Sequence, residues 1–182
     1  MIMDKETLRK KALENRNQIS EAKRREKSKA IIEKLEGLEE FSQAEKVLAY
    51  YSFGSEVETK EVLEKWAEEK QLYLPKLNED SSFQALPYGP LKENRYGIPE
   101  PAEGKPAEKL DLIILPGVAF DRNGGRLGMG KGYYDRFLAD MKGVLKIALA
   151  FQEQVLDSVP LSTYDENVNL IITDCEIIRP KS

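Results

Sequence analysis

The chain has 182 residues, of which 41% are hydrophobic and 33% charged, and its net charge is −4. This composition excludes a disordered chain, and the length predicts one domain over residues 1–182. It contains no histidine and one cysteine, Cys175, which excludes a Ser-His-Asp triad, a Cys-His pair, an internal disulfide and zinc sites of histidine or thiolate. No apolar run approaches the roughly 20 residues that span a bilayer and no secretory signal is visible, so we expect a cytoplasmic protein without membrane contact.

Two helices are expected at the amino terminus, and both are basic. Asp4 can open a helix over residues 4–17, and Ser20 can cap a second helix that ends near Leu35. Residues 1–34 hold eleven Lys and Arg against six Asp and Glu, whereas the rest of the chain is acidic. This basic arm could bind nucleic acid, supply cations to a phosphate site, or form a solvated helix face.

The remaining chain alternates between apolar strands and amphipathic helices. Helices are expected over residues 59–70, capped by Thr59, and over residues 131–142. Residues 78–109 are rich in proline and are expected to form an ordered surface loop with one short strand. Strands are expected at residues 46–53, 71–77 (cut short by Pro75), 83–88, 110–120, 144–151 and 168–174, with an edge strand within 176–180.

This alternation predicts the fold class. We expect an α/β protein, a single three-layer α/β/α Rossmann-like domain with a mostly parallel central sheet. Such sheets bind ligands beyond the carboxyl ends of their strands, at loops that lead into helices. Two loops occupy such positions, at residues 51–58 and at residues 124–135.

Residues 124–135 read GGRLGMGKGYYD and combine glycines with two cations, Arg126 and Lys131. Glycine lets backbone N–H groups approach an anion closely, so the stretch predicts a phosphate site, with a flexible solvent loop as the alternative. Residues 125–131 match the first seven positions of the P-loop pattern, but Gly132 stands where a P-loop has Ser or Thr. The missing hydroxyl argues against a P-loop NTPase and leaves Asp135 as the nearest candidate metal ligand.

Two tyrosines and two acids have two interpretations each. Tyr133 and Tyr134 are about 100° apart on a helix, so one can pack inward while the other faces a ligand, unless both are core residues. Asp165 is either a loop-capping acid or, beside Asp135, half of a magnesium site. Glu56 either favours a helix start at Thr59 by its charge or binds the amide and amine edge of a flat ring.

The second interpretation of Glu56 rests on its neighbours. Tyr51 and Phe53 stand close to it in the sequence YYSFGSEVE. Aromatic walls with one carboxylate suit a pterin-like heterocycle.

The string LPGVAFDRNGGRLGMGKGYYDRFL strongly resembles the signature of 5-formyltetrahydrofolate cyclo-ligases, also called 5,10-methenyltetrahydrofolate synthetases. Weaker similarities follow in the right order along nearly the whole chain, at KETLRKK, YYSFGSEVET, YGIPEP, ALAFQEQ and VPLSTYDENVNLII. The resemblance implies an enzyme that uses ATP and Mg²⁺ to convert 5-formyltetrahydrofolate to 5,10-methenyltetrahydrofolate, releasing ADP and phosphate. In this reaction the formyl oxygen would be phosphorylated, and nitrogen 10 would then close the ring.

The resemblance also implies a nucleotide site. Lys5 and Arg9 would contact ATP phosphates from one helix face, and Arg126 and Lys131 are the hypothesised catalytic stabilisers of developing charge. The nucleotide loop would comprise Arg126, Leu127, Gly128, Met129, Gly130, Lys131, Gly132, Tyr133, Tyr134 and Asp135.

A folate site and a metal site are implied next to this loop. Tyr51 and Glu56 would contact the folate, Tyr96 could cover its ring, and residues 129–133 (Met129, Gly130, Lys131, Gly132 and Tyr133) would border it. Some relatives carry arginine at the position of Met129, where it could contact a folate polyglutamate tail. Asp135 and Asp165 would hold Mg²⁺.

Two other functions stay open on the sequence alone. The basic arm could make the chain a nucleic-acid-binding module, although the acidic body argues against it. The chain could also be a small-molecule kinase, which the missing P-loop hydroxyl disfavours. We expect a monomer or weak homodimer that binds a small-molecule folate, with or without a polyglutamate tail, and no nucleic acid.

Overall fold

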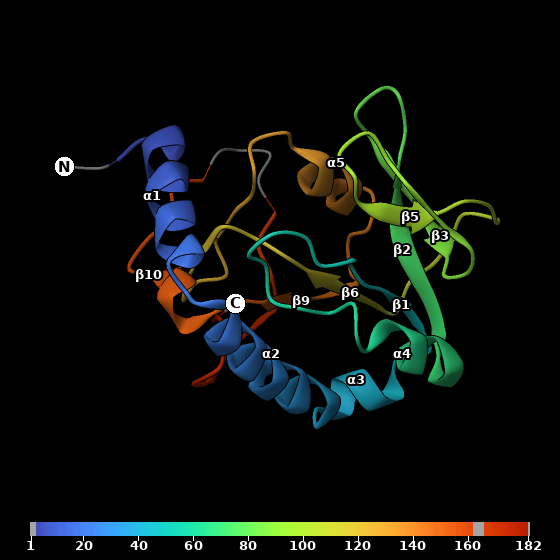
Figure 1. The fold of residues 1–182 in the computed structure, drawn as a ribbon, viewed down its shortest axis with the longest axis horizontal. Helices are drawn as coiled ribbons and strands as arrows, with labels where there is room; N and C mark the ends of the chain where they lie inside the picture. The colour runs from blue at the N-terminus through green and yellow to red at the C-terminus, as the bar shows by residue number, and fades with distance from the viewer. Residues whose placement is uncertain (1–2, 162–165, 182) are drawn as a thin grey trace.

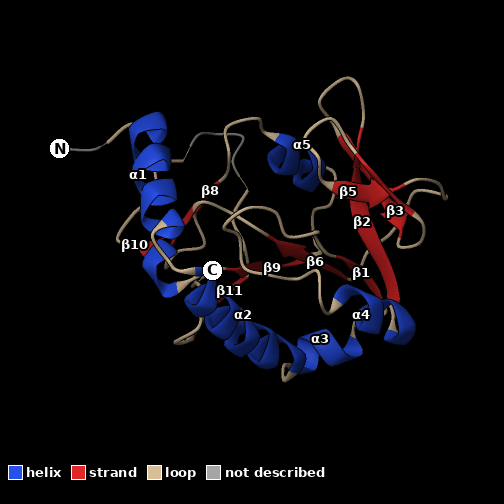
Figure 2. Ribbon diagram, viewed as in Figure 1, coloured by secondary structure: helices blue, strands red, loops and turns tan. Residues whose placement is uncertain are grey.

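The computed structural model describes residues 3–161 and 166–181, and a sheet of seven strands lies at its centre (Figures 1 and 2). The inner strands of this sheet run parallel, while β12 and β3 pair antiparallel at its two edges. The expected mostly parallel α/β sheet is therefore confirmed. In spatial order the strands are β12 (Ile177–Ile178), β11 (Leu170–Ile172), β9 (Leu145–Leu149), β6 (Leu112–Leu115), β1 (Lys46–Leu48), β2 (Gln71–Leu77) and β3 (Phe83–Pro87).

The strand order contains one reversal, between β1 and β6. The chain moves outward from β1 to β2 on one side, and from β6 through β9 to β11 on the other. Segments that leave two such neighbouring strands diverge, which opens a crevice at the carboxyl edge where α/β sheets bind ligands. Residues 49–56 and 116–118, which follow these strands, border this switch point.

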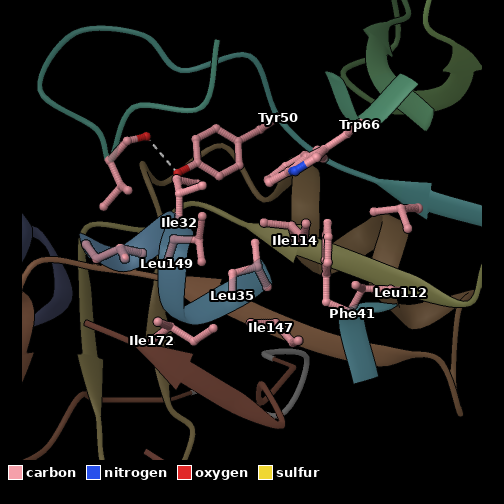
Figure 3. Close-up of a cluster of buried hydrophobic side chains, with 14 of the residues drawn as sticks. Ile32, Leu35, Phe41, Tyr50, Trp66, Leu112, Ile114, Ile147, Leu149 and Ile172 are labelled. Carbon is pink, nitrogen blue, oxygen red and sulfur yellow. Dashed lines mark hydrogen bonds between the residues drawn. The ribbon is translucent and has the colours of Figure 1, made fainter. Parts of the chain in front are cut away.

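Helices cover both faces of the sheet (Figure 1). α2 (Glu21–Glu36), α3 (Glu39–Gln43) and α4 (Leu63–Glu69) lie on one face, and α5 (Tyr133–Ala139) lies on the other. Successive strand residues point to opposite sides, so Val47 packs in the core under α2 to α4 while Leu48 packs in the core under α5. In the first core, shown in Figure 3, Phe41 and Trp66 meet with ring centroids 5.1 Å apart.

The basic helix α1 (Lys5–Asn17) belongs to neither of these layers. Its apolar side packs on a small sheet of β10 (Val155–Leu156), β7 (Ala119–Asp121) and β8 (Arg126–Leu127). Asp4 caps α1 by accepting a hydrogen bond from the Thr7 N–H at 2.7 Å, and Ser20 caps α2 in the same way, both as expected. Among the described residues, no helix is long and apolar enough to cross a membrane.

Two predicted strands are shorter than their apolar runs. β1 ends at Leu48 rather than at residue 53, and β6 ends at Leu115 rather than at residue 120. After these strand ends Ala49, Tyr50 and residues 116–120 stay buried, and Tyr50 and Val118 border the switch point, whereas Phe53 is exposed. An apolar run in the sequence therefore continued past the paired strand into the buried part of the loop that follows it.

Two predicted helix starts and one predicted strand end are also wrong. α4 begins at Leu63, because the Thr59 hydroxyl donates to the Tyr50 carbonyl at 2.5 Å and so braces the loop after β1 instead of capping a helix. α5 begins only after Gly132, whose φ of +73° is left-handed. β2 runs through Pro75, because its pairing with β1 ends at Tyr73. Proline lacks a backbone N–H, and on the β1 side of Pro75 no strand of the described chain accepts a hydrogen bond from that position.

The proline-rich region is ordered, as expected, and contains a hairpin of β4 (Leu91–Glu93) and β5 (Pro99–Pro101). The buried carboxylate of Glu100 accepts hydrogen bonds from the Leu77 N–H at 3.0 Å and from Asn94 at 3.2 Å. Glu100 thereby fixes the hairpin, and the turn at residues 94–98, against β2.

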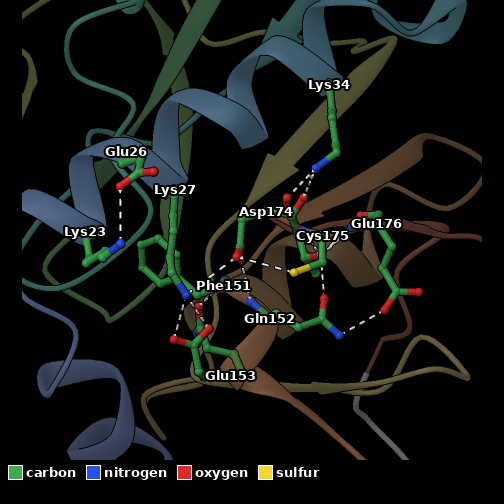
Figure 4. Close-up of polar contacts among 12 residues, drawn as sticks. Lys23, Glu26, Lys27, Lys34, Phe151, Gln152, Glu153, Asp174, Cys175 and Glu176 are labelled. Carbon is green, nitrogen blue, oxygen red and sulfur yellow. Dashed lines mark hydrogen bonds and ion pairs between the residues drawn. The ribbon is translucent and has the colours of Figure 1, made fainter.

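A polar cluster joins α2 to the loops that follow β9 and β11 (Figure 4). Lys27 contacts Glu153 at 2.8 Å, and Lys34 donates to two backbone carbonyls before Cys175. Beside these contacts, Glu176 accepts two hydrogen bonds from Arg122, at 2.7 and 2.9 Å, and one from Gln152.

The Glu176 contacts predict a loss of stability in acid. Hydrogen bonds from Arg122 and then Gln152 lower the pKa of Glu176 from its usual 4.5 to about 2. A depressed carboxyl pKa stabilises the fold above pH 4.5, and this contribution is lost as the pH falls from 4.5 towards 2. Glu176→Gln should therefore lower the melting temperature by roughly 1–3 °C at pH 7 and less at pH 2.5. An equal difference at both pH values, or the same response from the exposed control Glu68→Gln, would contradict this.

Candidate functional site

A cavity of about 790 Å³ lies at the switch point of the sheet. Its lining comes from one face of α1, the segments that follow β1 and β6, the strands β2 and β3, the turn at residues 94–99, and the stretch from β8 into α5. Every candidate site residue within the described part of the chain lines this cavity. They are Lys5, Arg9, Tyr51, Glu56, Tyr96, Arg126, Leu127, Gly128, Met129, Gly130, Lys131, Gly132, Tyr133, Tyr134 and Asp135.

Arg126 forms part of the cavity wall and is nearly fully buried. It lies on β8, and its Nε donates to the Pro116 carbonyl at 2.8 Å, which ties the glycine stretch to the segment after β6. Its guanidinium lies over the Tyr134 ring, 5.0 Å from the centroid. Packing and hydrogen bonding therefore hold this charge in one place.

Arg9 joins α1 to the glycine stretch across 119 residues of sequence. Its Nε donates to the Gly128 carbonyl at 2.7 Å. A Cβ at Gly130, where φ is +96°, would lie 3.2 Å from the Arg9 guanidinium, so glycine permits this close approach. Lys5 lines the same cavity one helical turn before Arg9, as the i,i+4 spacing predicted.

Lys131 stands between Gly130 and Gly132 in the glycine stretch, where it is exposed and also lines the cavity. The backbone around it is held by Arg136, which donates to the Lys131 carbonyl at 3.0 Å. Lys5, Arg9, Arg126 and Lys131 therefore surround one cavity, an arrangement that can bind several phosphate groups.

The chain path around these residues differs from that of a P-loop. β8 pairs antiparallel with β7, and no helix begins until Tyr133. A P-loop instead connects a strand directly to a helix that starts at its Lys and Ser or Thr. The incomplete sequence match is therefore not a Walker site, and α5, with only seven residues, contributes little dipole.

Tyr133 and Tyr134 both line the cavity and pack against the core under α5, but their hydroxyl groups have different surroundings. Tyr134 packs inward, with its ring centroid 5.1 Å from that of Phe83, and burial raises the pKa of its hydroxyl. The Tyr133 hydroxyl instead accepts a hydrogen bond from Arg95 at 2.8 Å and lies 3.1 Å from the Tyr96 hydroxyl. These contacts hold the 94–98 turn over the start of α5.

Glu56 lies in the cavity and does not support a helix cap at Thr59. Its Oε1 accepts a hydrogen bond from the Phe53 N–H at 2.8 Å, within the loop after β1. Burial raises the pKa of Glu56, while the Phe53 N–H and the charges of Arg16 and Arg126 lower it. With Tyr51 beside it in the lining, this carboxylate can receive hydrogen bonds from a polar, flat ligand.

Only one of the two expected metal ligands can be placed. Asp135, in the first turn of α5, lines the cavity and accepts a 3.4 Å hydrogen bond from the Glu166 N–H. Asp165 lies outside the described residues. Within residues 3–161 and 166–181, no three His, Cys, Asp or Glu side chains form a metal cluster. One carboxylate beside a phosphate site fits Mg²⁺, which commonly takes one or two carboxylates with phosphate oxygens and water.

The cavity lining also includes Arg16, Asn17 and residues 116–118, which were not predicted from the sequence. A signal for Arg16 was available, because three helical turns place it on the same face of α1 as Lys5 and Arg9. Residues 116–118 carried no such signal, since their apolar sequence continues that of β6.

The fold and this cavity define an α/β protein with a cationic ligand site at the switch point of its sheet. The chain matches the sequence profile of the 5-formyltetrahydrofolate cyclo-ligase family over residues 1–174. It is 36% identical over 135 residues to the 5-formyltetrahydrofolate cyclo-ligase of Haemophilus influenzae, which covers 68% of this chain and 72% of that protein.

Two solved structures resemble the fold closely. The 5,10-methenyltetrahydrofolate synthetase of Aquifex aeolicus superposes with a TM-score of 0.90 at 37% identity, over 99% of this chain and 94% of the other. The corresponding synthetase of Mycoplasma pneumoniae gives a TM-score of 0.74 at 26% identity, over 94% of this chain and 99% of the other. The chain therefore belongs to the 5-formyltetrahydrofolate cyclo-ligase family and is an enzyme of that class.

Proposed function

We propose that this protein converts 5-formyltetrahydrofolate to 5,10-methenyltetrahydrofolate, with ATP converted to ADP and phosphate. Family membership supports the overall conversion. The observation that carries the ATP requirement is one cavity with two chemically different kinds of lining residue. Lys5, Arg9, Arg126 and Lys131 supply positive charge to its lining, and Glu56 and Tyr51 supply a carboxylate and an aromatic ring to the same lining.

The reaction needs activation because the formyl oxygen is a poor leaving group. The formyl oxygen attacks the γ-phosphorus, and the bond from that phosphorus to ADP breaks. Nitrogen 10 then attacks the formyl carbon, the carbon–oxygen bond breaks, and phosphate departs with the proton lost from nitrogen 10. An amide oxygen already carries a nucleophilic lone pair, so the first step requires no strong general base, which suits a chain without histidine.

The chain's own residues supply alignment and charge. Arg126 and Lys131 stabilise negative charge that develops on the transferred phosphoryl group, and Lys5 and Arg9 hold the other phosphates. Glu56 orients the pterin ring, so that the formyl oxygen faces the γ-phosphorus. Asp135 would hold Mg²⁺, together with Asp165, and the ion would neutralise phosphate charge when bound.

The charges of the basic arm support a ligand role over nucleic-acid binding. Arg9 and Arg16 of α1 are directed at the protein's own loops, and Lys27 and Lys34 of α2 bond to the body of the protein. We further propose that the enzyme acts in the cytoplasm as a monomer or weak homodimer, and binds neither nucleic acid nor membrane.

A direct assay tests this function. Protein mixed with MgATP and 5-formyltetrahydrofolate should produce the near-ultraviolet absorbance band of the methenyl product and one ADP per product. ADP release with a stable phosphorylated product would instead indicate a small-molecule kinase. Absence of turnover together with salt-dependent RNA binding would indicate a nucleic-acid-binding module.

A further inference from the structure

A second buried arginine, Arg16, lines the cavity and has no role in the reaction proposed above. Its relative exposure is only 7%. Its Nε donates to the Ser55 hydroxyl at 2.8 Å, and its Nη1 donates to the Gly117 carbonyl at 3.1 Å. One side chain of α1 therefore contacts both segments of the switch point, the one after β1 and the one after β6.

The contact to Ser55 continues into a short chain of hydrogen bonds. The Ser55 hydroxyl accepts from Arg16 and donates to the Asn17 side-chain oxygen at 2.5 Å. Ser55 directly precedes Glu56, and both residues line the cavity. The end of α1 consequently holds the residue next to the carboxylate that we assign to the pterin ring.

Arg16 also acts on Glu56 by its charge. Within the described part of the chain, the charged or titratable groups that face this carboxylate are Arg16 of α1, Arg126 of β8, Tyr134 of α5 and Tyr50 after β1. Burial raises the pKa of Glu56, and among these four groups only the two arginines oppose that rise. Arg24 of α2 contacts the same loop at the Gly54 carbonyl, 3.4 Å away, and is not among the groups that act on Glu56.

We propose that Arg16 is a positioning residue for folate: it fixes the Ser55–Glu56 loop against α1 and so keeps the Glu56 carboxylate directed into the cavity. This inference rests on the proposed function, because it assigns Glu56 to the amide and amine edge of the pterin. Arginine suits the task better than lysine, since its planar fork can donate to Ser55 and Gly117 at once while remaining charged in a buried site.

Arg16→Met tests the proposal by separating folate binding from nucleotide binding. We expect KM for 5-formyltetrahydrofolate to rise roughly tenfold or more, because a charge-assisted contact to the ligand loop is lost. The thermal stabilisation by MgATP should persist, and kcat should change much less than KM. Without Arg16 a higher pH is needed to ionise Glu56, so the acid limb of kcat/KM should move to higher pH.

Two more variants separate charge from geometry. Ser55→Ala keeps the Arg16 charge and removes the hydroxyl that bonds the loop to Arg16 and Asn17, so KM should rise while the pH profile stays in place. Arg16→Lys restores the charge without the fork, so the acid limb should return towards wild type while KM stays elevated. Arg25→Gln, at an exposed arginine of α2 that pairs with Glu21 on its own helix, is the control and should keep wild-type kinetics.

The outcomes distinguish this inference from the proposed function. Wild-type protein without turnover would contradict the proposed function itself. Normal wild-type turnover, with unchanged KM and pH profile in Arg16→Met, would overturn the positioning role. An equal loss of MgATP stabilisation and kcat would also overturn it, since that pattern indicates general damage. If Arg16→Met does not fold, Ser55→Ala decides, and an unchanged KM in that variant would overturn the proposal.

Discussion

Replacing Lys131 by alanine should lower kcat about 100-fold, while KM for 5-formyltetrahydrofolate changes little. Lys131 is the exposed cation at the end of the glycine stretch, and it shares the cavity with Arg9 and Arg126. Charge shifts on the phosphoryl group only as the formyl oxygen attacks, so a cation beside it stabilises the transition state more than bound substrate. Steady-state kinetics with saturating MgATP measures this difference.

Two control variants test whether the effect on kcat is specific to the charge at Lys131. Lys142→Ala removes an exposed lysine just after α5, outside the cavity lining, and should leave kcat unchanged. Lys131→Arg keeps the charge and should recover part of the lost rate. Turnover of Lys131→Ala at the wild-type rate would remove Lys131 from the catalytic assignment and leave Arg126 as the main charge stabiliser.

The second large effect is expected at Gly124, where the glycine stretch begins. Gly124 has a φ of +89°, and an added Cβ would lie 2.5 Å from the Val168 carbonyl oxygen. The Gly124 carbonyl also accepts the Val168 N–H at 2.9 Å, so the two backbones cannot separate without losing this bond. Gly124→Ala should therefore lower the free energy of unfolding by about 3 kcal/mol and the melting temperature by roughly 6–12 °C.

Gly143 provides a matched control, because its φ of +87° is nearly the same but an added Cβ would meet nothing within 4 Å. Gly143→Ala carries only the backbone penalty of about 1 kcal/mol. Thermal unfolding of both variants separates the steric contribution from the conformational one. Equal melting temperatures for the two variants would show that the Val168 contact is not tight. Since Arg126 follows Gly124 by two residues, we also expect lower turnover from Gly124→Ala than from Gly143→Ala.

The sequence alone was sufficient to predict those parts of the structure that depend on interactions between residues close together in the chain. Asp4 and Ser20 cap their helices because a side chain can satisfy an N–H three residues away in any fold. The mostly parallel sheet followed from alternating apolar strands and helices. The string at residues 124–135 carried the family resemblance that the comparisons confirmed.

Other parts of the structure depend on contacts between distant residues, which no local pattern reports. Thr59 is a residue type that commonly caps helices, but here its hydroxyl donates to the Tyr50 carbonyl and accepts from the Ser52 N–H. Its own backbone N–H donates to the Ser52 hydroxyl. Pro75 continues β2 because the neighbouring β1 is too short to pair with it. The length of an apolar run could not separate a strand from the buried loop that follows it.

The sequence by itself determined the kind of chemistry that the site can perform. Composition excluded histidine chemistry, and the glycines that flank Arg126 and Lys131 indicated a phosphate site. Only the tertiary structure showed that Arg16 joins α1 to Ser55 and Gly117, 39 and 101 residues away. The physical reason is that backbone preference and helix periodicity act over a few residues, whereas a buried charge finds partners only once the chain has folded around it.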